Sequence, residues 1–99
     1  KLSKRKIWIG YGITPKGKLY VDQGAYEALV FRNKSLLSQG VREIEGEFSS
    51  GDAVSVVSPS GEEFARGIVY YSSDELEQLK GKKGYHEVIH RDNLVILHQ

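Results

Sequence analysis

The chain has 99 residues, of which 39% are hydrophobic and 27% charged, a size that fits one domain with one modest core. It contains no cysteine, which excludes a disulfide framework and cysteine-based zinc sites. No apolar run reaches the roughly 18 residues that a membrane-spanning helix needs, and no signal peptide opens the sequence. We therefore expect a cytoplasmic domain with no membrane partner. The first residue is Lys1 rather than methionine, which indicates a fragment or a processed chain.

The net charge of +1 conceals an asymmetry along the chain. Residues 1–42 contain nine Lys and Arg against two acidic residues, a balance of +7, whereas residues 43–99 contain five against eleven, a balance of −6. Four of the basic residues lie in the opening hexapeptide, which is typical of a ragged, solvated terminus. The acidic second part argues against a uniformly basic nucleic-acid-binding surface.

Short strands separated by turn residues dominate the predicted secondary structure. β-prone stretches bounded by Gly, Pro, Asn, Asp and Ser predict seven strands, at residues 6–9, 19–21, 41–48, 53–57, 64–71, 86–89 and 94–97. Imperfect alternation in the third strand predicts a bulge near Gly46, and residues 36–40 form a short apolar turn. Many short strands at this spacing favour a small barrel or sandwich.

Two short helices are predicted between the strands. Asp22 is a good N-cap for a helix that ends at about Phe31. Ser72, followed three residues later by Glu75, forms a capping box, which predicts a second helix over residues 73–79.

One short motif matches a zinc-protease signature. Residues 86–90 read His-Glu-Val-Ile-His, a pattern that needs a helix to bring both imidazoles onto one ion. The β-branched residues inside it predict a strand, which would set the two imidazoles about 13 Å apart. The one other histidine, His98, lies near the chain end, so we expect no metal site.

Two further motifs resemble phosphate chemistry. Residues 12–18 fit the phosphate-binding loop G-x-x-x-x-G-K, but Leu19 replaces the magnesium-binding Ser or Thr and a strand follows where a helix is required. Residues 90–92 (His-Arg-Asp) resemble a protein-kinase catalytic loop, but Leu97 stands where the metal-binding Asn is needed. The chain by itself is therefore not expected to be an enzyme.

A series of short motifs occurs in the order typical of a known family. They are Tyr20-Val21-Asp22 with Gly24-Ala25, Lys34-Ser35-Leu36-Leu37, Gly40-Val41, Gly46-Glu47-Phe48, Gly51-Asp52, Ala65-Arg66-Gly67 and Tyr71-Ser72-Ser73. From residue 17 onwards this order resembles the PUA domain of pseudouridine synthases, archaeosine transglycosylases and glutamate 5-kinases. The lead-in at 5–9 and the closing segment 88–95 are most similar to the C-terminal PUA domain of glutamate 5-kinases. The resemblance implies a mainly β, PUA-like pseudobarrel of short mixed strands with two short α-helices.

The resemblance divides the chain into a lead-in strand and linker at 1–16, from a missing N-terminal kinase domain, and a PUA domain at 17–99. It implies an accessory domain that tunes the assembly or regulation of a glutamate 5-kinase, an enzyme of proline biosynthesis. The absent kinase domain would use ATP and magnesium to phosphorylate glutamate, and this chain would need no cofactor. The partner would be that kinase domain, in a homo-oligomeric full-length protein, with Arg5, Lys6 and Trp8 at the domain junction.

The alternative is an RNA-binding module, which is the role of PUA domains in RNA-modifying enzymes. A glycine near a helix N-terminus lets a phosphate approach the first-turn amides closely. The RNA or phosphate contacts would be Gly24, Ala25, Arg32, Lys34, Arg66 and Tyr70. The kinases that the chain resembles carry a longer loop, ending in Leu-Gly-Tyr, before the last strands. Between Lys83 and Gly84, therefore, either the loop is shortened or a segment is missing from the sequence.

Overall fold

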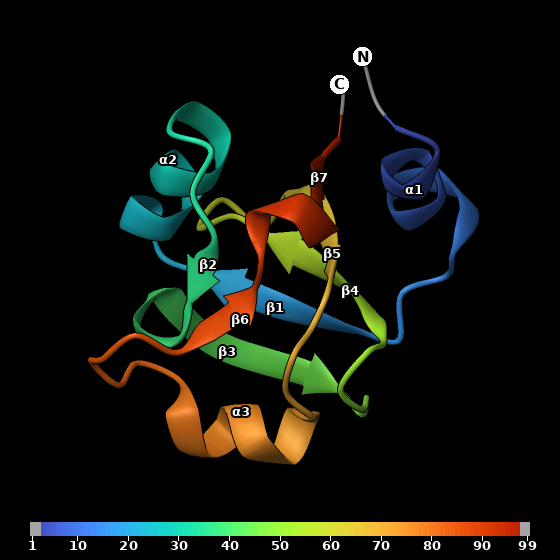
Figure 1. The fold of residues 1–99 in the computed structure, drawn as a ribbon. Helices are drawn as coiled ribbons and strands as arrows, with labels where there is room; N and C mark the ends of the chain where they lie inside the picture. Colours follow the sequence, from blue (N-terminus) through green and yellow to red (C-terminus); the bar gives the residue numbers. More distant parts are fainter. Residues whose placement is uncertain (1–2, 98–99) are drawn as a thin grey trace.

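The computed structural model describes residues 3–97, which form two sheets with short helices around them (Figure 1). The strands are β1 (Gly17–Val21), β2 (Leu36–Leu37), β3 (Val41–Gly46), β4 (Ala53–Val57), β5 (Glu63–Ile68), β6 (Glu87–Ile89) and β7 (Leu94–Ile96). The α-helices are α1 (Lys4–Ile7), α2 (Gln23–Phe31) and α3 (Ser73–Leu79). The larger sheet has the order β3-β1-β4-β5-β7, and β2 pairs with β6 in the smaller one. The predicted fold class, mainly β with short mixed strands, is confirmed. No helix within residues 3–97 is long and apolar enough to cross a membrane.

The larger sheet is mixed because β1 pairs with β4 in parallel and with β3 antiparallel. Every residue of β4 is buried, which explains its run of small and β-branched residues without alternation. The bulge predicted near Gly46 lies instead at Arg42, where the register moves from Tyr20 opposite Glu43 to Val21 opposite Val41. Gly46 pairs with Gly17 in register and has a φ of 90°, so it ends the strand rather than bulging within it.

The core lies between the two sheets and is covered by α2 and α3. Its fully buried large side chains are Phe64, Ile9, Leu19, Leu36, Leu76, Ile89, Val21, Val41, Val54, Val56, Val69 and Val88. Tyr26 of α2 packs edge-on against Phe64, with 4.7 Å between the ring centroids. This aromatic contact fixes the inner face of α2 on the sheet.

Both predicted helices are confirmed together with their capping residues. The backbone N–H of Ala25 donates to the Asp22 carboxylate at 2.8 Å, which starts α2. At α3 the Ser72 hydroxyl accepts from the Glu75 amide, and the Glu75 carboxylate accepts from the Ser72 amide at 2.8 Å. Each cap satisfies amides that have no partner inside the helix.

The strand predicted at 6–9 is wrong. Helix α1 begins after its N-cap Ser3 and continues into a π-helical turn, Trp8–Gly12, in which the Ile13 amide donates to the Trp8 carbonyl at 3.0 Å. The lead-in does not pair with the edge strand β7 but forms a helical turn that buries Ile9 and Gly10 on the larger sheet. Tertiary packing thereby overrides the local β-propensity. The seventh strand is β2, where an apolar turn was predicted.

The opening basic residues are solvated as predicted, since Lys4 and Arg5 are exposed and Lys6 is half-buried, but the described part of the segment is ordered rather than ragged. Arg5 donates to the side-chain carbonyl of Asn93, and the Lys6 ammonium donates to the Arg91 carbonyl at 3.3 Å. The lead-in is therefore held against the 3-10 turn Arg91–Asn93 that precedes β7.

The two sheets approach each other closely at Gly67 on β5, and a substitution there would test this packing. A Cβ atom there would lie 2.6 Å from Ile89 Cγ2 and 2.9 Å from the Asn93 carbonyl oxygen. We expect Gly67→Ala to lower the free energy of unfolding in urea by roughly 1–3 kcal/mol, because the core cannot give way without shifting backbone. The matched control is Gly24→Ala, whose Cβ would meet just the Asp22 carboxylate at 3.6 Å and should cost nothing. Equal losses in the two variants would contradict this packing.

Candidate ligand-binding groove

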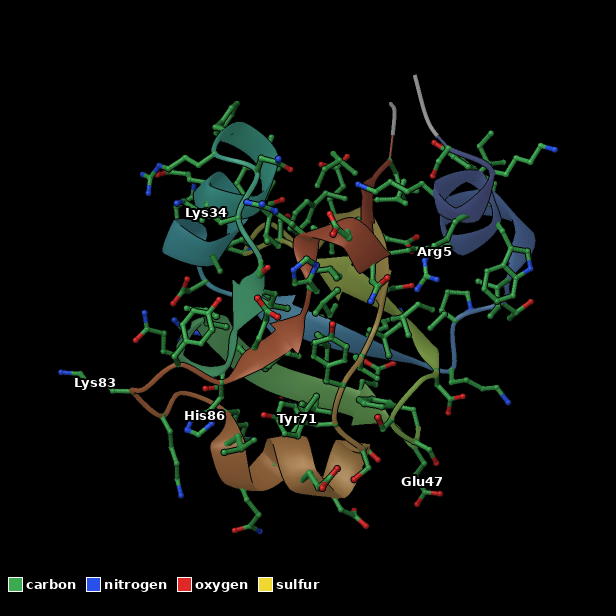
Figure 2. The ribbon with its side chains drawn as sticks, in the orientation of Figure 1. Arg5, Lys34, Glu47, Tyr71, Lys83 and His86 are labelled. Carbon is green, nitrogen blue, oxygen red and sulfur yellow. The ribbon has the colours of Figure 1, made fainter. Side chains whose placement is uncertain are left out.

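An open groove with a volume of about 920 Å³ runs along α2. Its other walls are β2, the 3-10 turn Ser38–Gly40, the loop that follows α3, and the segment at His90 and Arg91. Figure 2 shows Lys34 beside α2 and Lys83 on the loop after α3. The groove is therefore built by segments from both parts of the chain.

Close packing sets the start of α2 on the floor of the groove. A Cβ at Gly40 would lie 2.6 Å from the Ala25 Cβ, so just a glycine fits beneath the first turn of the helix. The Asp22 amide donates to the Gly40 carbonyl at 3.0 Å, which joins the helix N-terminus to the 3-10 turn. Gly24 faces open space except for the Asp22 carboxylate, so a ligand can approach the backbone there.

The far end of α2 brings basic side chains to the same groove. Asn33 adopts a left-handed conformation with a φ of 52°, which reverses the chain. The Arg32 and Lys34 amides both donate to the Ala28 carbonyl at 3.2 Å, so both residues stay beside the helix end. The Ser35 hydroxyl then accepts from the Arg91 amide at 2.9 Å, which adds the next arginine to the wall.

The groove carries a positive charge that the protein does not neutralise. Its cationic side chains are Arg32, Lys34, Lys83 and Arg91, and none of them takes part in a salt bridge within residues 3–97. Both acidic side chains of the lining are already engaged. Asp22 caps α2, and Glu87 accepts from the Tyr85 hydroxyl at 3.1 Å. That hydrogen bond raises the pKa of Tyr85 above its ordinary value. The free cations are therefore available to an anionic ligand.

Four of the six predicted RNA or phosphate contacts line this groove, namely Gly24, Ala25, Arg32 and Lys34. The other two lie elsewhere. The Arg66 guanidinium binds the Gly10 carbonyl at 3.1 Å and the Glu63 carboxylate at 2.8 Å. Tyr70 follows β5 and is 45% exposed outside the groove. Sequence reasoning missed Arg91 and Lys83 as groove residues, because no local pattern places them beside α2.

The catalytic look-alike motifs have the secondary structure predicted for them. β6 lies inside the His-Glu-Val-Ile-His motif, and the His90 Nδ1 accepts from the Asp92 amide at 3.0 Å, which makes it the cap of a turn. His98 lies outside the described residues. Among residues 3–97, no group of three or more His, Asp or Glu side chains is placed to hold a metal ion. In the phosphate-loop motif, Gly17 opens strand β1 rather than a helix.

Comparison with known sequences and structures agrees with this architecture. The family model of the PUA domain matches residues 17–90, and the chain belongs to the PUA domain family. A PUA domain structure from Aeropyrum pernix in complex with tartrate is 31% identical, with a TM-score of 0.70 over 77% of this chain and 41% of that one. A chain of an archaeal box H/ACA ribonucleoprotein, 20% identical with a TM-score of 0.59 over 74% of this chain and 24% of that one, shares the fold.

The relatives that match over nearly the whole chain are glutamate 5-kinases. The glutamate 5-kinase of Dictyoglomus thermophilum is 47% identical over 99% of this chain and 29% of its own length. That of Caldanaerobacter subterraneus is 49% identical over 97% of this chain and 29% of its own length. The chain thus spans under a third of the relatives that it matches. The resemblance to the glutamate 5-kinase PUA region is confirmed.

The first of these alignments extends over more positions than this chain can fill. It has 109 positions, and 99% of a 99-residue chain is 98 residues, so about 11 residues of the relative have no counterpart here. A longer loop in the relative, at the position between Lys83 and Gly84 of this chain, would account for these residues. That the extra residues lie at this position stays a prediction.

The pKa of Glu63 reports whether its partner Arg66 is engaged within the fold. Burial raises the pKa of Glu63, but hydrogen bonds from Arg66 and Ser55 outweigh burial and hold the pKa below its ordinary value. The pair therefore stabilises the fold above the unfolded-state pKa, and this contribution is lost as the pH falls through the folded-state pKa. In Arg66→Met we expect the pKa of Glu63 to rise, since burial remains while a donor is gone.

A titration of the side-chain carboxyl carbons by NMR would measure that pKa. Arg42→Met, at an exposed residue of the edge strand β3, is the control and should leave Glu63 unchanged. An unshifted Glu63 in Arg66→Met would mean that Arg66 is free to bind an external anion.

Proposed function

We propose that this chain is the accessory PUA domain of a glutamate 5-kinase, and that it tunes the assembly or the effector response of that enzyme. One observation carries the proposal: glutamate 5-kinases are 47–49% identical to nearly all of this chain, which fills just 29% of their length. The transfer of a phosphoryl group from ATP to glutamate, with magnesium, then belongs to the remaining part of the protein. This chain by itself phosphorylates nothing and needs no cofactor.

Features of the described residues support that division of labour. The phosphate-loop motif at 12–18 opens a strand, so it lacks the helix N-terminus that would face a nucleotide phosphate. His90 is occupied as the cap of a turn. In this proposal Arg5, Lys6 and Trp8 lie near the domain junction, residues 1–16 link to the kinase domain, and the full-length protein is a cytoplasmic homo-oligomer.

Removal of this domain from the full-length protein tests the proposal. We expect the truncated enzyme to retain glutamate-dependent ATP turnover but to change its oligomeric state or its response to end-product inhibition. Steady-state kinetics with light scattering would measure both properties, and the isolated chain in the same assay should give no turnover. Full turnover by the isolated chain, or a truncated enzyme unchanged in both properties, would contradict the proposed role.

A second function, RNA binding, is favoured by the charge of the groove. Arg32 and Lys34 are exposed, without an acidic partner among residues 3–97, and lie at one end of an open groove. Arg91 extends the same charge along the wall. Guanidinium and ammonium groups form charge-assisted hydrogen bonds with backbone phosphates and release counterions when they bind. The charge of the open groove thus supports binding of a nucleic-acid backbone.

Fluorescence anisotropy with a labelled structured RNA, at about 50 and 200 mM salt, distinguishes this function. We expect saturable binding that weakens with salt. The salt slope should be smaller by about one in Arg32→Gln and in Lys34→Gln, because each variant removes one cation that pairs with a phosphate. Lys16→Gln, at an exposed residue that precedes β1 and lies outside the groove lining, is the matched control and should bind as the parent chain does. Absence of binding at both salt concentrations would leave the accessory role alone.

A further inference from the structure

The N-terminal residues 4–12, which we call the hook, form a rigid platform on the larger sheet. Ile9 is fully buried, and a Cβ at Gly10 would lie 3.0 Å from Val95 Cγ1, so the hook rests directly on β7. The Arg66 guanidinium donates to the Gly10 carbonyl and ties the hook to β5. Hydrogen bonds from Arg5 and Lys6 hold its first turn to the segment before β7. The hook is therefore fixed on its inner side.

The outer side of the hook is apolar and unpartnered within residues 3–97. Ile7, Trp8 and Tyr11 are 49%, 53% and 56% exposed, and they are three of the six large hydrophobic side chains that the described residues expose. Tyr11 lies three residues after Trp8 and four after Ile7, spacings that make it the neighbour of both on the surface of the helical turn. The indole of Trp8 lies against Gly12, where a Cβ would come within 3.0 Å of it, so the ring is held in place while half of it faces solvent.

The described chain both starts and finishes close to the hook. The match covers 99% of this chain but 29% of the Dictyoglomus protein, so most of that protein is joined at an end of the matched region. The described chain starts at residue 3, next to α1, and finishes at Leu97, whose Cδ2 lies 3.7 Å from the Cβ position of Gly10. Figure 1 shows α1 and β7, the first and last elements of the described chain, on the side of the molecule away from α3. Whichever end carries the remainder, it begins at the hook.

We propose that Ile7, Trp8 and Tyr11, the hook face, dock onto the larger remaining part of the full-length protein. This inference rests on the proposed function, since it takes the chain as one domain of a longer enzyme. Aromatic side chains held rigidly and half exposed are the usual anchors of an interface core. Residues 1–16 contain no acidic residue, and within the hook Lys4 is exposed while Arg5 and Lys6 add positive charge on its inner side. The docking partner is therefore an apolar surface with an acidic rim.

Hydroxyl-radical footprinting of the full-length protein, compared with the 99-residue chain, tests this docking. We expect the oxidation rates of Ile7, Trp8 and Tyr11 to fall about fivefold in the full-length protein, because they pass from half exposed to the dry centre of an interface. Tyr70, which is 45% exposed on another surface, is the internal control and should react equally in both. Equal oxidation of the hook face in both proteins would overturn the proposal.

Variants of the full-length protein distinguish direct docking from other causes of protection. Trp8→Ala should restore the oxidation of Ile7 and Tyr11 to the rates in the 99-residue chain, and Tyr11→Ser should do the same for Trp8. Tyr70→Ala is the matched control and should leave the hook face protected. Retained protection in both hook variants would overturn the proposal, as would protection of the 99-residue chain that appears on raising its concentration, which would assign the face to a second copy.

The readout also separates this proposal from the proposed function, because footprinting does not depend on phosphorylation. Protection in a full-length protein that fails to phosphorylate glutamate would overturn the kinase assignment and support the docking face. Phosphorylation without protection would overturn the docking face and leave the kinase assignment standing.

Discussion

The parallel pairing of β1 with β4 is the constraint on which the rest of this structure depends. Two parallel neighbours cannot be joined by a tight turn, so the chain must leave the end of β1 and return to the start of β4 by a crossover. Residues 22–52 make that crossover, and they contain α2, β2, the 3-10 turn Ser38–Gly40 and β3. The groove lies along this crossover because α2 and β2 are its walls. Residues of the crossover therefore form one side of the groove, and residues 81–91 complete it.

The turn Arg91–Asn93 connects the two surfaces that this structure presents. On one side the Arg91 amide donates to the Ser35 hydroxyl at the groove. On the other side the Arg91 carbonyl and the Asn93 side chain accept hydrogen bonds from the hook. Two hydrogen bonds therefore connect the hook to the groove wall, one from Lys6 to the Arg91 carbonyl and one from the Arg91 amide to Ser35. One turn therefore lies between a basic groove and the hook, whose outer face is apolar.

The local elements were the parts most readily predicted from the sequence. The caps at Asp22 and at Ser72 with Glu75 involve residues three apart, so the sequence around each helix start is enough to predict the hydrogen bonds that begin α2 and α3. The hook was predicted as a strand because Ile7 and Ile9 have high β-propensity. The packing of Ile9 and Gly10 on β7, over 80 residues further along the chain, decided otherwise. Two of the four cationic side chains of the groove, Lys83 and Arg91, escaped prediction for the same reason, since Ser35 and Arg91 meet across a separation of 56 residues.

The sequence by itself determined six of the seven strands, the two capped helices, the family and the basic residues Arg32 and Lys34 that follow α2, because each is carried by short-range patterning or by motif order. Tertiary structure alone decided which of those basic residues share a groove, that Arg66 is turned inward to Glu63 and Gly10, and that the lead-in becomes a helical hook with an apolar outer face. The physical reason is that hydrogen bonds and buried contacts between distant segments leave no periodic signal in the sequence. These contacts form when the crossover and the second sheet bring the distant segments together, so the tertiary structure is needed to identify them.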